Sequence, residues 1–155
     1  RIANEEKLKR AEKTMNAYPE GVPHEQCTLS HIRVVWRLSD GSSGHAMLVA
    51  YRVFRAGKQF GKIPGVLGRS EFGLEIVITL AQLVYGMGLS FDAACQVIGF
   101  FQNLKLSKSQ ADALLRQLSY YWAGEFEVLC TLLANSLVVH ADETSWSIHS
   151  VWAFR

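Results

Sequence analysis

The chain has few cysteines, and they lie far apart. Its 155 residues include three, Cys27, Cys95 and Cys130, so no two of them have the CxxC spacing of a zinc knuckle. An odd number of widely separated cysteines also argues against a disulfide framework. The sequence therefore predicts no structural zinc, no disulfides and a reducing compartment.

Long apolar runs are also missing. The longest, LEIVITLAQLVYGM from Leu74, is shorter than the roughly 20 residues that a membrane span needs, and it contains Glu75 and Gln82. The chain opens with neither an initiating Met nor a signal peptide, and it has no internal repeat. We therefore expect an interior piece of an intracellular protein with no membrane segment.

Apolar residues make up 49% of the chain, enough for one moderate core or two small ones. Charge is divided unevenly along it. Residues 1–69 hold 12 Lys and Arg against 6 Asp and Glu, whereas residues 70–155 hold 4 against 8. A basic front half attracts polyphosphate, which the acidic rear half would repel unless cations intervene.

The front half is predicted to begin with a helix. Residues 1–17 place Glu5 with Lys9 and Glu6 with Arg10 at i,i+4, which is typical of a solvated helix. The prolines and glycine of residues 18–23 then break it.

Two strands follow, HIRVVWRL and HAMLVAYRVF, joined by the turn sequence SDGSSG. Strand alternation predicts that the first has an apolar face and a basic one. The apolar face would carry Ile32, Val34 and Trp36, and the other Arg33, Val35 and Arg37.

From residue 70 the pattern becomes helical. Ser70 and Ser90 are predicted to cap two helices, the first of which ends at Gly88. Ser107 and Gln110 form a capping box that opens a long third helix. Its buried stripe is predicted to consist of Leu114, Leu115, Leu118, Trp122, Phe126, Leu129 and Leu133.

The end of the chain, VVHADETSWSIHSVWAF, predicts a strand that leads into an acidic tip. His140 and Asp142 share one face of this strand and Glu143 the other, so Asp142 is the better candidate ligand for a hard cation. Two alternatives stay open. Asp142 can accept hydrogen bonds in its own turn at Thr144 or Ser145, or it can join His140 in a small metallohydrolase site.

The basic segment is the first candidate DNA-binding region. Its cations are interleaved with Tyr51, Phe54 and Phe60, which suits phosphate contact with some stacking. The candidate DNA-binding residues are Arg33, Arg37, Arg52, Arg55, Lys58, Lys62 and Arg69. The alternative is an ordinary solvated basic face.

The predicted helix pair around Leu104 to Leu106 is a second, weaker candidate. It has the outline of a helix-turn-helix, with Lys108 and Arg116 near the start of its second helix. The alternative is plain packing of a helical hairpin.

The segment GRSEFGLEIVITLAQLVYGMGLSFDAACQVIGFFQNLKLSKSQADALLRQL, together with the acidic tip, resembles the insertion-sequence-66 group of bacterial DDE transposases. The resemblance spans about residues 64–155. Its matching letters are Asp142, Glu143, Thr144, Ser145 and Trp146, then Val151, Trp152, Ala153 and Phe154.

The resemblance implies a ribonuclease-H-like catalytic core whose first acidic metal ligand is Asp142. Two divalent cations, Mg²⁺ or Mn²⁺, would support cleavage and transfer of DNA strands in the bacterial cytoplasm. The family's remaining acids lie beyond Arg155, so we expect an inactive fragment of a parent enzyme, which can be a homo-oligomer. The chain departs from many relatives in offering Cys27 alone where they carry paired cysteines.

The predicted fold class is α+β, in four segments. These are a solvated helix and linker over 1–22, a basic β-hairpin segment over 23–69, a helical region over 70–135, and the first strands of a truncated ribonuclease-H-like core over 136–155. The rival to a transposase is a non-catalytic DNA-binding or assembly module left by a decayed element. The reading frame beyond Arg155 separates the two, because the transposase needs a further Asp at a strand end and a later helical Glu.

Overall fold

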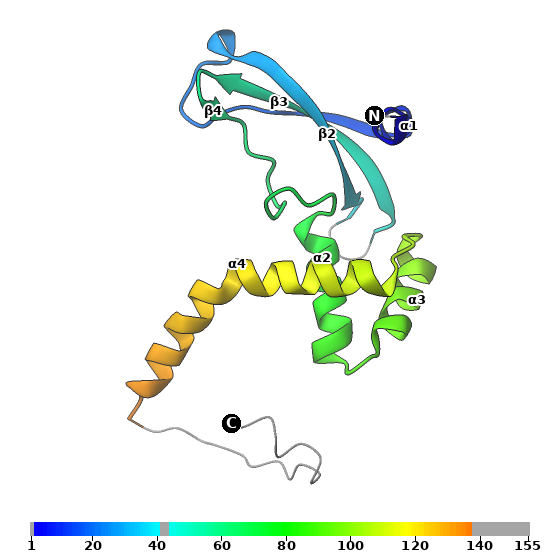
Figure 1. The fold of residues 1–155 in the computed structure, drawn as a ribbon, viewed down its shortest axis with the longest axis vertical. Helices are drawn as coiled ribbons and strands as arrows, with labels where there is room; N and C mark the ends of the chain where they lie inside the picture. The colour runs from blue at the N-terminus through cyan, green and yellow to red at the C-terminus, as the bar shows by residue number, and fades with distance from the viewer. Residues whose placement is uncertain (1, 41–43, 138–155) are drawn as a thin grey trace. The chain divides into compact units, whose positions relative to one another are not determined.

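The computed structural model describes residues 2–40 and 44–137 (Figure 1). The chain divides into two units, residues 1–121 and 122–155. In its described part the protein has an open mixed sheet and four α-helices, which confirms an α+β fold. The sheet elements are β1 (Lys13–Ala17), β2 (Thr28–Leu38), β3 (Ala46–Ala56) and β4 (Gln59–Phe60), and the helices are α1 (Ile2–Lys9), α2 (Leu74–Ala81), α3 (Phe91–Gln102) and α4 (Lys108–Ala134).

The sheet is built around β3. The strand order is β1-β3-β2, with β2 antiparallel and β1 parallel to β3, while β4 pairs antiparallel with the end of β3. The register of the β2–β3 pair places Trp36 opposite Leu48 and His31 opposite Val53. The predicted pairing of the two long strands is therefore confirmed.

The prediction of one helix over residues 1–17 was wrong. Helix α1 ends at Lys9, and the chain turns to form β1, whose pairing begins where the N–H of Glu12 donates to the carbonyl of Leu48 at 2.9 Å. The i,i+4 charge pairs contribute only a few tenths of a kcal/mol each, about 0.2–0.5. Backbone hydrogen bonds offered by the free edge of β3 outweigh them, because short helices are marginal without packing.

Two apolar clusters form the core of the first unit. One lies on a face of the sheet and consists of Ala17, Val35, Val49, Tyr51, Val53 and Ile63. The other joins the end of the sheet to the helices, and consists of Leu38, Ala46, Ile76, Val77, Leu80, Leu83, Ala94, Ile98, Leu104, Ala111, Leu114, Leu115 and Leu118. Figure 1 shows α2, α3 and the start of α4 gathered at this end of the sheet.

The predicted division of β2 into an apolar and a basic face is wrong in one respect. Val35, placed on the basic face, is fully buried, whereas Ile32 on the predicted apolar face is 43% exposed. The reason is that the segment after β4 folds back over the face of Val35, where Ile63 joins the sheet-face cluster. Arg33 and Arg37 share that face and donate hydrogen bonds to this segment.

Two of the three predicted helix starts are confirmed. The Oγ of Ser90 accepts from the N–H of Ala93 at 3.2 Å, and Ser107 with Gln110 forms the reciprocal capping box. Ser70 does not cap a helix. Its Oγ accepts from Phe72 at 3.1 Å, because residues 71–73 extend the sheet before α2 begins.

This extension is a short bridge to the edge of β2. The N–H of Trp36 donates to the carbonyl of Glu71, and the N–H of Gly73 donates to the carbonyl of Trp36, both at 2.8 Å. Helix α2 then starts after Gly73, and a π-helical turn over Gln82–Gly86 carries it to the predicted end. Gly88 follows in the left-handed region with φ of 70°.

The apolar stripe of α4 is buried only along its first half. Leu114, Leu115 and Leu118 are buried in the helical cluster, as predicted. Trp122, Phe126, Leu129 and Leu133 are each at least 50% exposed, contrary to the prediction. The helical cluster ends at Leu118, and neither core cluster of the described chain includes them.

The cysteines in the helices differ from one another. Cys95 packs beside the helical cluster, and burial raises the pKa of its thiol, as expected of a core cysteine. Cys130, although it lies in an apolar stretch of α4, is exposed. Among the helices that the structure describes, none is long and apolar enough to cross a membrane.

The capping box gives a direct test of local structure. Ser107→Ala removes the acceptor of the Gln110 N–H and is expected to lower the free energy of unfolding by about 1 kcal/mol. Ser119→Ala is the control, because Ser119 is an exposed residue inside α4, where alanine is the better helix former. Urea denaturation followed by circular dichroism measures both, and equal effects would contradict a capping role.

Candidate nucleic-acid interface

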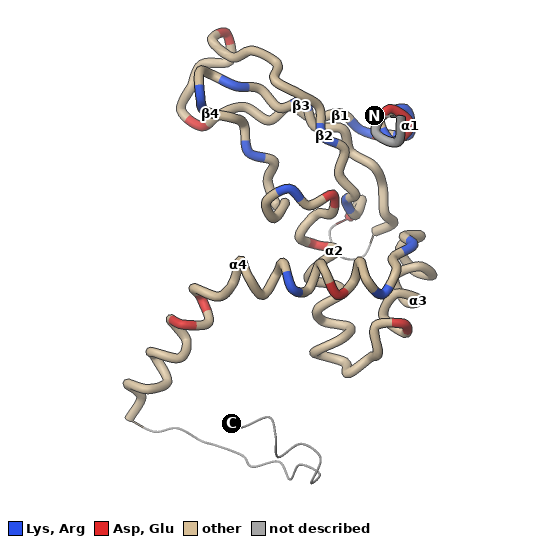
Figure 2. The backbone as a smooth tube through the Cα atoms, in the orientation of Figure 1, with Lys and Arg blue, Asp and Glu red and all other residues tan. Residues whose placement is uncertain are grey.

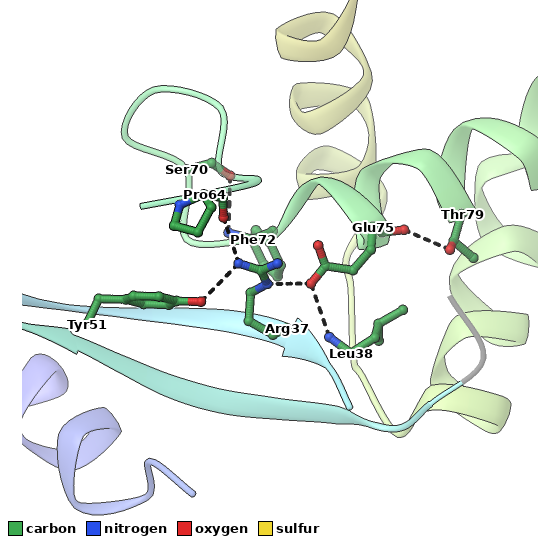
Figure 3. Close-up of polar contacts among 8 residues, drawn as sticks. All are labelled: Arg37, Leu38, Tyr51, Pro64, Ser70, Phe72, Glu75 and Thr79. Atoms are coloured by element: carbon green, nitrogen blue, oxygen red, sulfur yellow. Dashed lines mark hydrogen bonds and ion pairs between the residues drawn. The ribbon is translucent and has the colours of Figure 1, made fainter. Parts of the chain in front are cut away.

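Arg37 lies in a polar network and is not free in solvent (Figure 3). Its Nε is 2.6 Å from Oε1 of Glu75, and its Nη1 donates to the hydroxyl of Tyr51 at 3.0 Å and the carbonyl of Pro64 at 2.8 Å. The side chains of Arg37 and Glu75 are only 23% and 17% exposed. The same carboxylate accepts from the N–H of Leu38 at 3.3 Å. Because its charge is neutralised within the protein, we leave Arg37 out of the proposed interface.

Arg33 lies on the same face of β2 but has a different environment. Its Nη2 donates to the carbonyl of Ser70 at 3.0 Å, and its Nη1 donates to the carbonyl of Gly68 at 3.4 Å. Two neutral carbonyls hold the guanidinium in place, and in the described part of the chain no carboxylate lies within 4.0 Å of it. Its fork carries five N–H donors, so some stay available to a ligand.

The other candidate cations, apart from Arg52, lie on β3 and on the segment that follows it. Arg55, Lys58, Lys62 and Arg69 are exposed, and in the described part of the chain none lies within 4.0 Å of a carboxylate. Figure 2 shows basic residues recurring along the sheet and the segment after β4. None of these four cations is therefore held in an ion pair within the described chain.

Some of these groups meet around one hollow. Its volume is about 510 Å³, and it is lined by His31, Arg33, Val53, Phe60, Gly61 and Arg69. No carboxylate lines it. Phe60 is 50% exposed, and the centroid of its ring lies 6.5 Å from that of His31, with the two planes inclined at 56°.

The register of the sheet explains why these side chains lie together. Residues directly opposite one another share a face, and so do residues two apart in one strand. Val53 faces His31 on β2, while Arg55 faces Phe60 on β4. The side chains of His31, Val53, Arg55 and Phe60 therefore belong to one face of the sheet.

Gly61 fixes the position of Phe60. Its N–H donates to the carbonyl of Phe54 at 2.8 Å, and a β-carbon at this position would collide with the backbone carbonyl of Ala17. Only glycine allows the chain leaving β4 to pass this close to the end of β1. The aromatic ring is thus held at the rim of the hollow by backbone contacts.

Arg52 is separated from this group. It pairs with Asn16 on β1 and Ile32 on β2, so its side chain belongs to the opposite face of the sheet. Of the seven predicted residues, the structure brings Arg33 and Arg69 together at the hollow. His31 is not among the predicted residues, although strand alternation from Arg33 places it on the same face.

The weaker candidate, the helix pair α3–α4, packs as part of the helical core. Lys108 lies 2.6 Å from Asp92, and Arg116 lies 2.9 Å from Asp112. The cations at the start of α4 are therefore paired with carboxylates. This arrangement favours a packed helical hairpin over a DNA-reading helix.

The predicted metal ligand Asp142 and its neighbour His140 lie outside the described residues. Within residues 2–40 and 44–137, no three His, Cys, Asp or Glu side chains are close enough together to hold a metal ion. The metal site at Asp142 therefore stays a prediction.

Comparison with known proteins identifies no relative. No protein-family model, curated protein or solved structure matches the chain. The resemblance to DDE transposases is likewise still a prediction.

Proposed function

We propose that this chain is part of a bacterial DDE-type transposase and contributes a DNA-binding surface on its sheet. The observation that carries the DNA-binding part is the hollow beside β2, where Arg33 and Arg69 lie with His31 and no carboxylate. Cations that lie together outside any ion pair suit the phosphate backbone of DNA. Arg55, Lys58 and Lys62 extend the positive surface around it.

This surface would bind duplex DNA mainly through its phosphates. Each cation that neutralises a phosphate releases a condensed counterion, so affinity falls as salt rises. Such contacts position the protein on DNA but carry little sequence information. We therefore assign no base-specific contact to these residues.

The catalytic part of the proposal rests on the resemblance at Asp142. Mg²⁺ or Mn²⁺ would bind there together with acids from further along the parent protein. The bound cations would support cleavage and transfer of DNA strands. A single carboxylate does not hold a metal pair, so this chain alone is expected to be inactive. The proposal places the parent protein in the bacterial cytoplasm, as a homo-oligomer if it assembles.

The alternative is a non-catalytic DNA-binding or assembly module, which the same hollow supports equally well. The reading frame beyond Arg155 decides between them. A further Asp at a strand end and a later helical Glu would support the transposase, and a frame without these acids would leave the non-catalytic module. The metallohydrolase alternative at His140 and Asp142 lies outside the described residues and stays a prediction.

Binding of the chain to a blunt DNA duplex tests the proposed surface. If about four phosphates are contacted, the logarithm of the association constant should fall with the logarithm of salt concentration with a slope of about −4. Fluorescence anisotropy of a labelled duplex between 50 and 200 mM salt, about the range over which such slopes are resolved, measures this. Absent or salt-insensitive binding would refute the proposed DNA contact.

A further inference from the structure

Duplex binding leaves one feature of the hollow unexplained. Phe60 holds a half-exposed aromatic ring among cations, yet the bases of a duplex are stacked on one another and offer it no free face. We propose that the hollow binds an unpaired nucleotide of single-stranded DNA, with its base on Phe60 and its phosphate between Arg33 and Arg69. This inference rests on the proposed function, DNA binding, and specifies single-stranded DNA as the ligand of the hollow.

The hollow has the size and charge for such a ligand. Its 510 Å³ lies within the range of small-molecule sites, about 300–1,000 Å³. Arg33 is already oriented by the carbonyls of Gly68 and Ser70, so little side-chain freedom is lost when a phosphate binds. Arg69 is exposed and adds a second positive charge at the rim.

The aromatic groups of the sheet differ in whether their faces are already covered. On the opposite face, the ring of Tyr18 stacks on those of His24 and Phe54, with centroid distances of 3.9 Å and 4.5 Å. The faces of these rings are therefore already covered. Phe60 meets His31 only at a tilt of 56° and a distance of 6.5 Å. Its ring is thus open to stacking by a base, which is the usual way in which proteins hold single strands.

A neighbouring hollow shows the contrast in charge. It shares Arg33 and Arg69 with the first hollow and is also lined by Glu5 and Glu71. Two carboxylates repel a phosphate, and Glu71 already pairs with Lys7 at 2.7 Å. The nucleotide is therefore assigned to the carboxylate-free hollow.

The test compares a blunt duplex with the same duplex carrying a single-stranded thymidine overhang. By fluorescence anisotropy, the wild-type chain is expected to bind the overhang DNA about 10-fold more tightly, because one stacked base contributes that much. Phe60→Ala and Phe60→Leu should both lose this preference, so that the ratio of the two affinities falls to about one. Phe60→Trp should keep it.

Leu29→Ala is the matched control, because Leu29 is 53% exposed and pairs with Phe54 on the opposite face. It should leave both affinities unchanged. Phe60→Leu guards against a packing defect, since it keeps an apolar side chain and removes only the aromatic face.

Three outcomes would overturn the inference. The first is equal affinity of the wild-type chain for the two DNAs. The second is an equal loss of affinity for both DNAs in Phe60→Leu. The third is displacement of the overhang DNA by micromolar thymidine monophosphate, which would make a free nucleotide the ligand. Intact, salt-dependent binding of the blunt duplex in each case would leave the proposed function standing. Loss of that binding in the wild-type chain would instead refute the proposed function itself.

Discussion

Replacing Glu75 with glutamine is expected to lower the free energy of unfolding by about 2–3 kcal/mol. The variant keeps an oxygen that can accept from the N–H of Leu38, but it removes the charge that faces Arg37 at 2.6 Å. The guanidinium would then be left mostly buried without a counterion. The expected loss is below that of a fully buried pair because the two side chains keep 23% and 17% exposure. Urea denaturation followed by circular dichroism measures it.

Glu71→Gln is the control for this prediction. Glu71 pairs with Lys7 at 2.7 Å, a similar distance, but the two side chains are 54% and 31% exposed. Such surface pairs contribute only about 0–1 kcal/mol. If the two variants lose the same small amount, the Arg37–Glu75 pair does not hold the sheet to α2.

A double-mutant cycle separates the ion pair from other effects of the substitution. Arg37→Met removes the other partner, and combining it with Glu75→Gln should cost less than the sum of the single losses, because neither charge is then left unpaired. An additive result would show that the two side chains act independently.

Local sequence signals predicted much of the fold. The caps at Ser90 and Ser107, with Gln110, were predictable because each joins a side-chain oxygen to a backbone N–H three residues later. The long hairpin was also predictable, since its two strands alternate and are close in sequence. Such signals require no knowledge of distant packing.

The segments whose structure was predicted wrongly depend on partners that are distant in the sequence. Residues 13–17 became β1 because β3 offered a free edge, and residues 71–73 joined β2 at Trp36 where a helix start was expected. Val35 is buried because a later segment covers it. These outcomes require knowing which elements meet, and local propensity does not contain that information.

The candidate site shows the same division. Composition indicated a basic segment, but Arg33 and Arg69 lie 36 positions apart in the sequence, and only the fold brings them to one hollow. Nothing in the sequence distinguished Arg37, which binds Glu75, from these two. Asp142, the predicted metal ligand, lies outside the described residues.

Neutralising three exposed cations of the proposed interface is expected to reduce affinity for a blunt duplex by about 100-fold at 100 mM salt, roughly 1 kcal/mol for each cation replaced. The triple variant is Arg55→Gln, Lys62→Gln and Arg69→Gln. Its salt slope should become shallower by about 3, one for each phosphate that is no longer neutralised. These side chains make no ion pair in the described chain, so removing them should leave the free energy of unfolding nearly unchanged.

A second triple variant, Lys105→Gln, Lys108→Gln and Arg116→Gln, removes the same net charge from the helical region. Two of these cations are already paired, with Asp92 and Asp112, so we expect affinity to change by less than about 3-fold, the effect of long-range attraction alone. Equal weakening in both triples would mean that net charge, and no particular surface, governs binding. Selective loss in the sheet triple, with an unchanged melting temperature, would locate the DNA on the face that carries the hollow.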